Sequence, residues 1–155
     1  MIRFAIVLVL LAALPAAAAP RAGGPVQTVG EYTLYFGVLP SAITQGTPHS
    51  AGPKDAHGLP RADFNLEHHF LVVVERTRDG VRPRDAVVTV SVPIAGSTVT
   101  RTLSPMPING LMSYGTVFVL PRAARYVFDT TVRIPGRAAP LHARFVYAHQ
   151  QPRRP

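Results

Sequence analysis

The sequence predicts an all-β protein whose folded part is one antiparallel β-sandwich. From Gly30 onward, apolar and β-branched residues alternate with polar ones in short runs, which is the pattern of half-buried strands. Clusters of Gly, Pro, Asp and Asn separate these runs, and no stretch repeats its apolar residues at helical spacing. About seven such strands joined by turns over about 120 residues are typical of an immunoglobulin-like sandwich.

The N-terminus has the pattern of a secretory signal peptide. A short basic start is followed by an apolar run from Phe4 to Leu14, by Pro15, and by small residues at Ala16–Ala19 that suit cleavage. The apolar run is too short to span a membrane, which takes about 20 residues. We therefore expect residues 1–19 to be removed, the mature chain to lack a transmembrane segment, and the protein to be periplasmic or secreted.

The mature chain is expected to hold a single domain. Residues 20–30 form an N-terminal extension, residues 31–149 form the sandwich, and residues 150–155 form a disordered tail. The turn signals delimit the expected strands as Glu31–Leu39, Glu67–Arg76, Asp85–Val92, Ser97–Leu103, Tyr114–Leu120, Arg125–Ile134 and Leu141–His149. A tight turn is expected at Asp79-Gly80, because Gly supplies the positive φ that hairpin turns need.

The segment 40–65 is too long for an ordinary connection between strands. It is rich in Gly, Pro, His and Ser, and it carries His49 and His57. Connections longer than about 12–15 residues without structure of their own are usually functional or disordered. Both interpretations of this loop stay open at the level of sequence.

Composition excludes several classes of function. The chain has no Cys, so it has neither disulfides nor thiolate metal ligands. It has 16 Lys+Arg against 8 Asp+Glu, but the arginines are scattered rather than gathered in a helix or an aromatic stripe, so nucleic-acid binding is not expected. No nucleophile elbow, phosphate loop, dinucleotide fingerprint or zinc-protease helix is present, so we expect no catalytic residues and no enzyme activity.

Strand alternation places the adjacent histidines His68 and His69 on opposite faces of one strand. His69 shares its face with Glu67, whereas His68 shares its face with Phe70 and lies at the end of the core face. The two histidines cannot both enter a site on one face, so one of them is the expected ligand.

The segment Leu103–Gly115, "LSPMPINGLMSYG", carries Met106 and Met112, which are two of the three methionines of the chain. A thioether there either fills a packing gap at the end of the core or serves as a soft metal ligand. Thioethers together with imidazoles favour Cu(I) over hard, oxygen-seeking ions.

Within this segment, "MPINGLMSYG" resembles the periplasmic copper- and iron-binding proteins that accompany ferrous-iron permeases. In that family a Met is followed seven residues later by a metal-binding His in a His-Tyr-Gly setting. Met106 matches the methionine and Tyr114-Gly115 match the end of the motif, but Ser113 stands where the histidine belongs. The stretches "HHFLVVVERTRDG" and "ARYVFDTTVRIPG" resemble two further strands of the family, whereas "YTLYFG" lacks the family's His-X-Glu pair.

The resemblance implies an exported, immunoglobulin-like protein that buffers or delivers copper, or iron together with copper. It also implies a membrane metal permease or a metallochaperone as partner. Because Ser113 replaces one ligand, we expect a rearranged site with Met106 as first thioether, an imidazole from His68 or His69, Met112 as substitute donor, and a loop histidine. The candidate metal ligands are Met106, Met112, His68, His69, His57 and His49.

A metal-free alternative remains at this level. The chain would then be a β-sandwich interaction module that binds another envelope protein through a sheet edge or through the loop 40–65. If the methionines and histidines converge on one point, the metal-binding hypothesis is favoured. If they are scattered, the interaction module is favoured.

Overall fold

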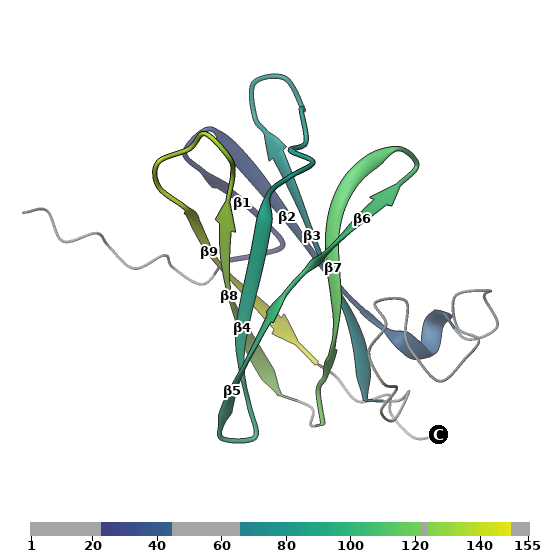
Figure 1. The fold of residues 1–155 in the computed structure, drawn as a ribbon. Coiled ribbons are helices and arrows are strands. Elements are labelled where there is room, and N and C mark those ends of the chain that lie inside the picture. The colour runs from purple at the N-terminus through teal and green to yellow at the C-terminus, as the bar shows by residue number, and fades with distance from the viewer. Residues whose placement is uncertain (1–22, 45–65, 122–123, 150–155) are drawn as a thin grey trace, which may run out of the picture.

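The computed structural model describes residues 23–44, 66–121 and 124–149, and this part of the chain is an antiparallel β-sandwich (Figure 1). The predicted fold class is therefore confirmed. The strands are β1 (Val26–Val29), β2 (Tyr32–Pro40), β3 (Glu67–Arg76), β4 (Val87–Ile94), β5 (Ser97–Thr102), β6 (Ser104–Ile108), β7 (Leu111–Val119), β8 (Arg125–Arg133) and β9 (Leu141–Ala148). A short 3-10 helix, η1 (Ser41–Thr44), follows β2. The predicted signal peptide, most of the predicted loop 40–65 and the predicted tail lie outside the described residues.

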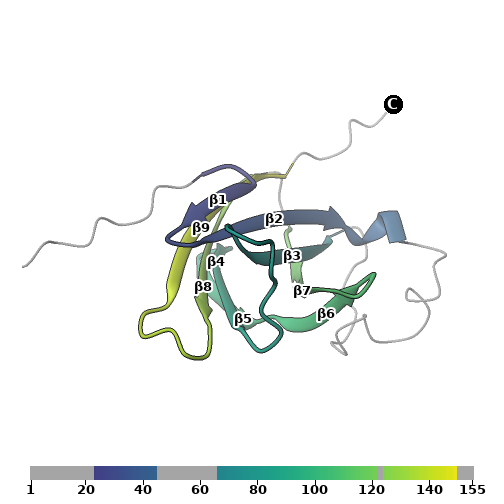
Figure 2. The ribbon, with the colours of Figure 1, turned by 90° about the horizontal axis from the view of Figure 1, so that it is seen from above.

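Two sheets make the two layers of the sandwich. One has the strand order β1-β2-β3-β7-β6 and the other has the order β5-β4-β8-β9. Seen from above, the strands form a flattened ring, with β1 beside β9 on one side and β5 running into β6 on the other (Figure 2). On the first side the Gln27 side-chain amide donates to the Arg144 carbonyl at 2.7 Å. On the second side Leu103 alone separates β5 from β6, and the buried Leu103 donates its N–H to the Val88 carbonyl at 2.8 Å.

The core lies between the sheets and is built from alternate residues of the central strands. In β3 these are residues such as Phe70 and Val72, which are almost completely buried. Aromatic rings fill the middle of the core: Phe36 stacks on Phe145 with ring centroids 4.7 Å apart, and Phe70 lies 4.6 Å from Phe128. Aromatic pairs at these separations add to the stability that burial of their area supplies.

Strand β1 was not expected, because residues 20–30 were assigned to an extension. It is only four residues long, and it pairs antiparallel with β2 from Val26↔Tyr35 to Val29↔Tyr32. So short a run carries too few alternations to stand out in a sequence. The folded domain therefore begins before residue 31.

Strand β6 was also missed, because Pro105 and Pro107 interrupt its pattern. Both lie on the strand at the edge of the five-stranded sheet, where they oppose Tyr114 and Met112 of β7. Two residues that are two positions apart in a strand direct their backbone nitrogens to the same edge of that strand. Strand β6 therefore tolerates both prolines when their nitrogens face away from β7. Asn109 and Gly110 close the β6–β7 hairpin with φ of 51° and 77°, as a two-residue turn of type I′ requires.

The turn expected at Asp79-Gly80 is present, but it does not join the two strands of a hairpin. Gly80 has φ of 70° and donates its N–H to the Arg76 carbonyl at 2.9 Å. Beyond this turn the chain crosses from β3 in one sheet to β4 in the other. The hairpin interpretation was wrong because the turn residues determine a local reversal and carry no information on which sheet the next strand joins.

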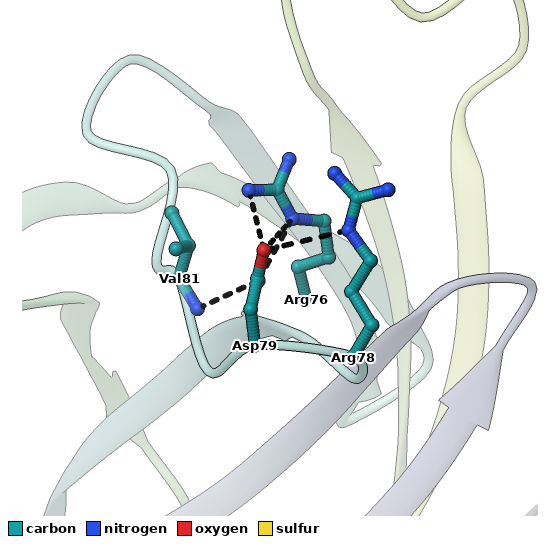
Figure 3. A network of polar contacts seen from close by, with 4 residues as sticks. All are labelled: Arg76, Arg78, Asp79 and Val81. Carbon is teal, nitrogen blue, oxygen red and sulfur yellow. Dashed lines mark hydrogen bonds and ion pairs between the residues drawn. The ribbon is translucent and has the colours of Figure 1, made fainter.

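Asp79 organises this turn (Figure 3). Its carboxylate accepts hydrogen bonds from Arg76 Nε at 2.9 Å and from the Val81 N–H at 3.3 Å, and it pairs with Arg78 Nε at 3.4 Å. The hydrogen bond from Arg76 is the main reason that the pKa of Asp79 is lowered from 3.8 to about 2. The Asp79 carboxylate thus offsets part of the positive charge that Arg76 and Arg78 bring to this turn.

The last two strands carry one ion pair. Asp129 of β8 and Arg144 of β9 are direct cross-strand neighbours, and Arg144 Nε lies 2.5 Å from Asp129 Oδ1. The pair is half exposed, so its contribution to stability is small. Within the described residues, no helix is long and apolar enough to cross a membrane.

Candidate metal-binding site

His68 lies near the start of β3 and points between the two sheets. It shares the inner face of the strand with Phe70, and only 1% of its surface is exposed. Its cross-strand neighbours are Pro40 of β2 and Phe118 of β7. The expectation that His68 lies at the end of the core face is confirmed.

Hydrogen bonding determines which nitrogen of His68 carries the proton. Nδ1 lies 3.0 Å from the Leu66 carbonyl oxygen, which can only accept, so Nδ1 donates and Nε2 keeps its lone pair. Nε2 is buried and has no hydrogen-bond partner among the described residues. A metal-ligating histidine has this arrangement, with one N–H held by a backbone carbonyl and the other nitrogen directed at the ion.

Burial of the His68 ring lowers its pKa below the usual 6.5. The hydrogen bond to Leu66 acts in the opposite direction, and the nearby His149 lowers the pKa further. The imidazole is therefore neutral at pH 7, which is the form that binds metal ions.

A second imidazole lies against the first, at the end of β9. The ring centroids of His68 and His149 are 4.4 Å apart and the rings are steeply inclined, at 72°. Tyr147 borders both rings, at 5.9 Å from His68 and at 6.2 Å from His149, where the rings are nearly parallel. Tyr126 of β8 lies 6.5 Å from His149. We call His68, His149, Tyr147 and Tyr126 the end cluster.

Sequence reasoning missed His149, although a signal was present. The alternation that places Phe145 and Tyr147 on the core side of the last strand also assigns His149 to that side. The contact with His68 could not be read from the sequence, because β3 and β9 belong to different sheets.

His69 points to the opposite side of β3, as alternation predicts. It faces outward between Leu39 and Val117, and Glu67 on the same face is almost completely buried. His68 and His69 therefore cannot bind one ion on a single face of the sheet.

Met106 and Ser113 form a cross-strand pair on the outer face of the five-stranded sheet. The Ser113 hydroxyl donates to the Met106 carbonyl, so Ser113 supports the backbone of the hairpin. Leu71 and Gly115 lie beside them on this face. His69 lies on the same face, but its cross-strand neighbour is Val117, which is four residues along β7 from Ser113. His69 is therefore about 14 Å along the sheet from the pair of Met106 and Ser113.

Met112 points to the other side of the sheet. It follows Leu111 and precedes Ser113 in β7, and it packs against the hydrophobic core. The two methionines thus lie on opposite faces, so Met112 does not stand in for the histidine that Ser113 replaces. The cross-strand neighbour of His68 is Phe118, which is six residues along β7 from Met112. His68 and Met112 are therefore about 20 Å apart along the sheet. The described residues therefore do not assemble the rearranged site of Met106, Met112 and a β3 histidine.

His49 and His57 lie outside the described residues. Across residues 23–44, 66–121 and 124–149, no three His, Cys, Asp or Glu side chains gather as a metal site. The end cluster offers two imidazoles, a type of ligand that suits copper, zinc, iron and nickel.

No protein-family model and no curated protein sequence matches the chain. Solved structures resemble its fold. A DUF4426 family protein of Pseudomonas aeruginosa has a TM-score of 0.59 at 20% identity, covering 81% of this chain and 95% of that chain. Copper-bound FetP of uropathogenic Escherichia coli, as a variant, has a TM-score of 0.60 at 12% identity, covering 81% and 94%.

Copper-reconstituted P19 of Campylobacter jejuni gives a similar result, with a TM-score of 0.60 at 10% identity, covering 82% of this chain and 94% of that chain. The predicted resemblance to periplasmic copper-binding proteins is confirmed as a likeness of fold. At these identities the likeness extends to the fold alone.

Proposed function

We propose that this protein binds copper in the periplasm and buffers the ion or hands it on, without catalysing a reaction. The observation that carries the proposal is the His68 imidazole. Its Nδ1 is held by the Leu66 carbonyl, and its buried Nε2 has no hydrogen-bond partner in the part of the chain that the structure describes. A buried polar nitrogen left unpaired costs about 1–3 kcal/mol, so a ligand for it stabilises the fold. The likeness of the fold to copper-bound FetP and P19 favours copper among the metals that imidazole binds.

A role in storage or transfer fits the donor set better than catalysis does. Among the described residues, no third His, Asp or Glu joins the two imidazoles of the end cluster to form a metal site. Its remaining coordination positions would be filled by water or by a donor from a partner such as a membrane permease or a metallochaperone. Iron binding stays a prediction of the sequence resemblance, tested by the same titration.

The test is a titration of the mature chain, residues 20–155, produced without a polyhistidine tag. We expect one copper per chain to survive desalting. Copper at about 100 times its dissociation constant should stabilise the fold by about 2.7 kcal/mol, which raises the melting temperature by roughly 10 °C. Cu(I), Cu(II) and Fe(II) are titrated separately. If no metal is retained and the melting temperature does not move, the proposal is wrong.

A metal-free interaction module is the second candidate, and one observation favours it. The outer face of the five-stranded sheet exposes apolar side chains, with Leu39 at 55%, Leu111 at 52% and Tyr35 at 39% exposure. Exposed apolar side chains on one face of a sheet can mark a contact with another protein, and two of these, Tyr35 and Leu39, lie on the same strand, β2. This candidate predicts that copper leaves the melting temperature unchanged, so the same titration separates the two.

A further inference from the structure

His68 and His149 come from opposite sheets and meet where β3 begins and β9 ends. We infer that these two imidazoles form the copper site, at this end of the sandwich and not at the Met106 hairpin. The inference rests on the proposed function and names the ligands for it. It replaces the ligand set expected from sequence with a pair that includes a residue the sequence did not single out.

His68 is prepared as a ligand before any ion arrives. Its ring is held by the Leu66 carbonyl and packed inside the sandwich, so Nε2 has little freedom to turn elsewhere. A ligand that is already oriented loses little conformational entropy on binding. The hydrogen bond to Leu66 also keeps Nδ1 protonated, which makes Nε2 the metal-binding nitrogen.

His149 supplies the second nitrogen from a position that is better exposed to solvent. Its backbone N–H donates to the Ala124 carbonyl at 2.9 Å, which anchors the end of the last strand. Its side chain is half buried, and the nearly parallel ring of Tyr147 limits its orientation. One ligand is thus buried and fixed while the other borders the solvent, which gives the ion a route in and out.

The hairpin offers a poorer environment for an ion. Met106 has Ser113 across the strand pair and Leu71 and Gly115 beside it, and none of these supplies a nitrogen or sulfur ligand. Metal–nitrogen and metal–sulfur bonds are about 2.0–2.3 Å long, so His69, about 14 Å along the sheet, cannot join Met106 at one ion.

Figure 1 places the two regions at opposite ends of the sandwich: β3 begins at the lower end, whereas the β6–β7 turn lies at the upper end. Substitutions in one region therefore leave the other undisturbed, and the two locations can be tested separately.

The test compares copper affinity, by competition with a chromophoric chelator, among the untagged mature chain and four variants. His149→Phe and His68→Phe keep an aromatic ring in the end cluster but remove the nitrogen. His142→Ala removes an exposed histidine of the same β9 strand as a matched control, and Met106→Leu removes the hairpin thioether.

We expect His149→Phe and His68→Phe each to weaken copper binding by at least about tenfold. The control and Met106→Leu should stay within about twofold of the wild type. Nitrogen hyperfine splitting in the Cu(II) electron paramagnetic resonance spectrum should change in the His149 variant and persist in the His142 variant.

Retention of wild-type affinity by His149→Phe overturns the inference, and so does loss of affinity in Met106→Leu. If the wild type binds copper while either result is obtained, the proposed function stands and only the ligand assignment fails. If the wild type binds no copper, both fail. His68 is buried, so circular dichroism first checks the folding of His68→Phe; should that variant unfold, the result for His149→Phe decides.

Discussion

Tyr114 connects the two layers through a single buried hydroxyl group. Its Oη donates to the Pro83 carbonyl at 2.7 Å and accepts from the Ala86 N–H at 3.1 Å. Both partners lie in the connection that carries the chain from β3 to β4, so the side chain ties β7 of one sheet to the start of the other sheet. Burial raises the pKa of Tyr114 above 10, which keeps the hydroxyl protonated.

We therefore expect Tyr114→Phe to lower the free energy of unfolding by about 1–3 kcal/mol, because it leaves the buried Ala86 N–H and the part-buried Pro83 carbonyl without their partner. Urea denaturation measures the change. Tyr35→Phe is the matched control, since Tyr35 is 39% exposed and should change stability by less than about 0.5 kcal/mol. Equal effects of the two substitutions would contradict the assigned role of the Tyr114 hydroxyl.

Asp79 gives a prediction about pH. Its pKa is about 2 in the folded chain, whereas the ordinary value of 3.8 applies to the unfolded chain. Because folding lowers the pKa, the ionised carboxylate stabilises the fold above about pH 4. This contribution is lost as the pH falls toward 2, because the carboxylate is then protonated in both states. Asp79→Asn should lower the melting temperature at pH 7, and its difference from the wild type should shrink below pH 4. A difference that is constant from pH 7 to pH 3 would show that the charge is not the cause.

Among the strands and turns, two of the tight hairpins form a natural comparison. The β6–β7 turn uses Asn109-Gly110, whereas the β4–β5 turn uses Ala95-Gly96 with φ of 49° and 85°. An alanine in the left-handed region is strained by roughly 1–2 kcal/mol, whereas Asn tolerates it better. The β4–β5 turn is thus the less favourable of the two.

Ala95→Asn should accordingly raise the free energy of unfolding by about 1 kcal/mol, since it relieves this strain at an exposed turn. The reverse change, Asn109→Ala, should lower it by a similar amount. Thermal unfolding of both variants measures the two effects. A neutral or destabilising Ala95→Asn would mean that the turn conformation is not the source of strain.

Strand β6 shows why some elements escape sequence reasoning. Prolines such as Pro105 and Pro107 usually argue against a strand in the middle of a sheet. They are compatible with an edge strand, which pairs on one side only. Whether a strand lies at an edge is decided by its neighbours in space. Strand β3, by contrast, has the bounds expected from its ten-residue alternation, Glu67–Arg76.

The whole molecule should reach its compartment by way of the predicted signal peptide. Expression of residues 1–155 in a Gram-negative host should yield a periplasmic protein that begins at Pro20, because Ala16–Ala19 provide the small residues that a signal peptidase needs. Mass spectrometry of the purified protein measures this. A full-length chain that stays with the membrane fraction would contradict it.

The sequence by itself determined the fold class, the faces of the strands and the inward position of His68, because side chains in a strand alternate with a period of two residues. Only the tertiary structure decided that Met106 and Met112 lie on opposite faces of the β6–β7 hairpin, since β6 itself was not recognised.

Only the tertiary structure brought His149 of one sheet against His68 of the other, 4.4 Å apart between ring centroids. Periodicity describes the surroundings of a residue within its own strand. Contact between residues 81 positions apart depends on how the two sheets stack, which is determined by the packing of the whole core.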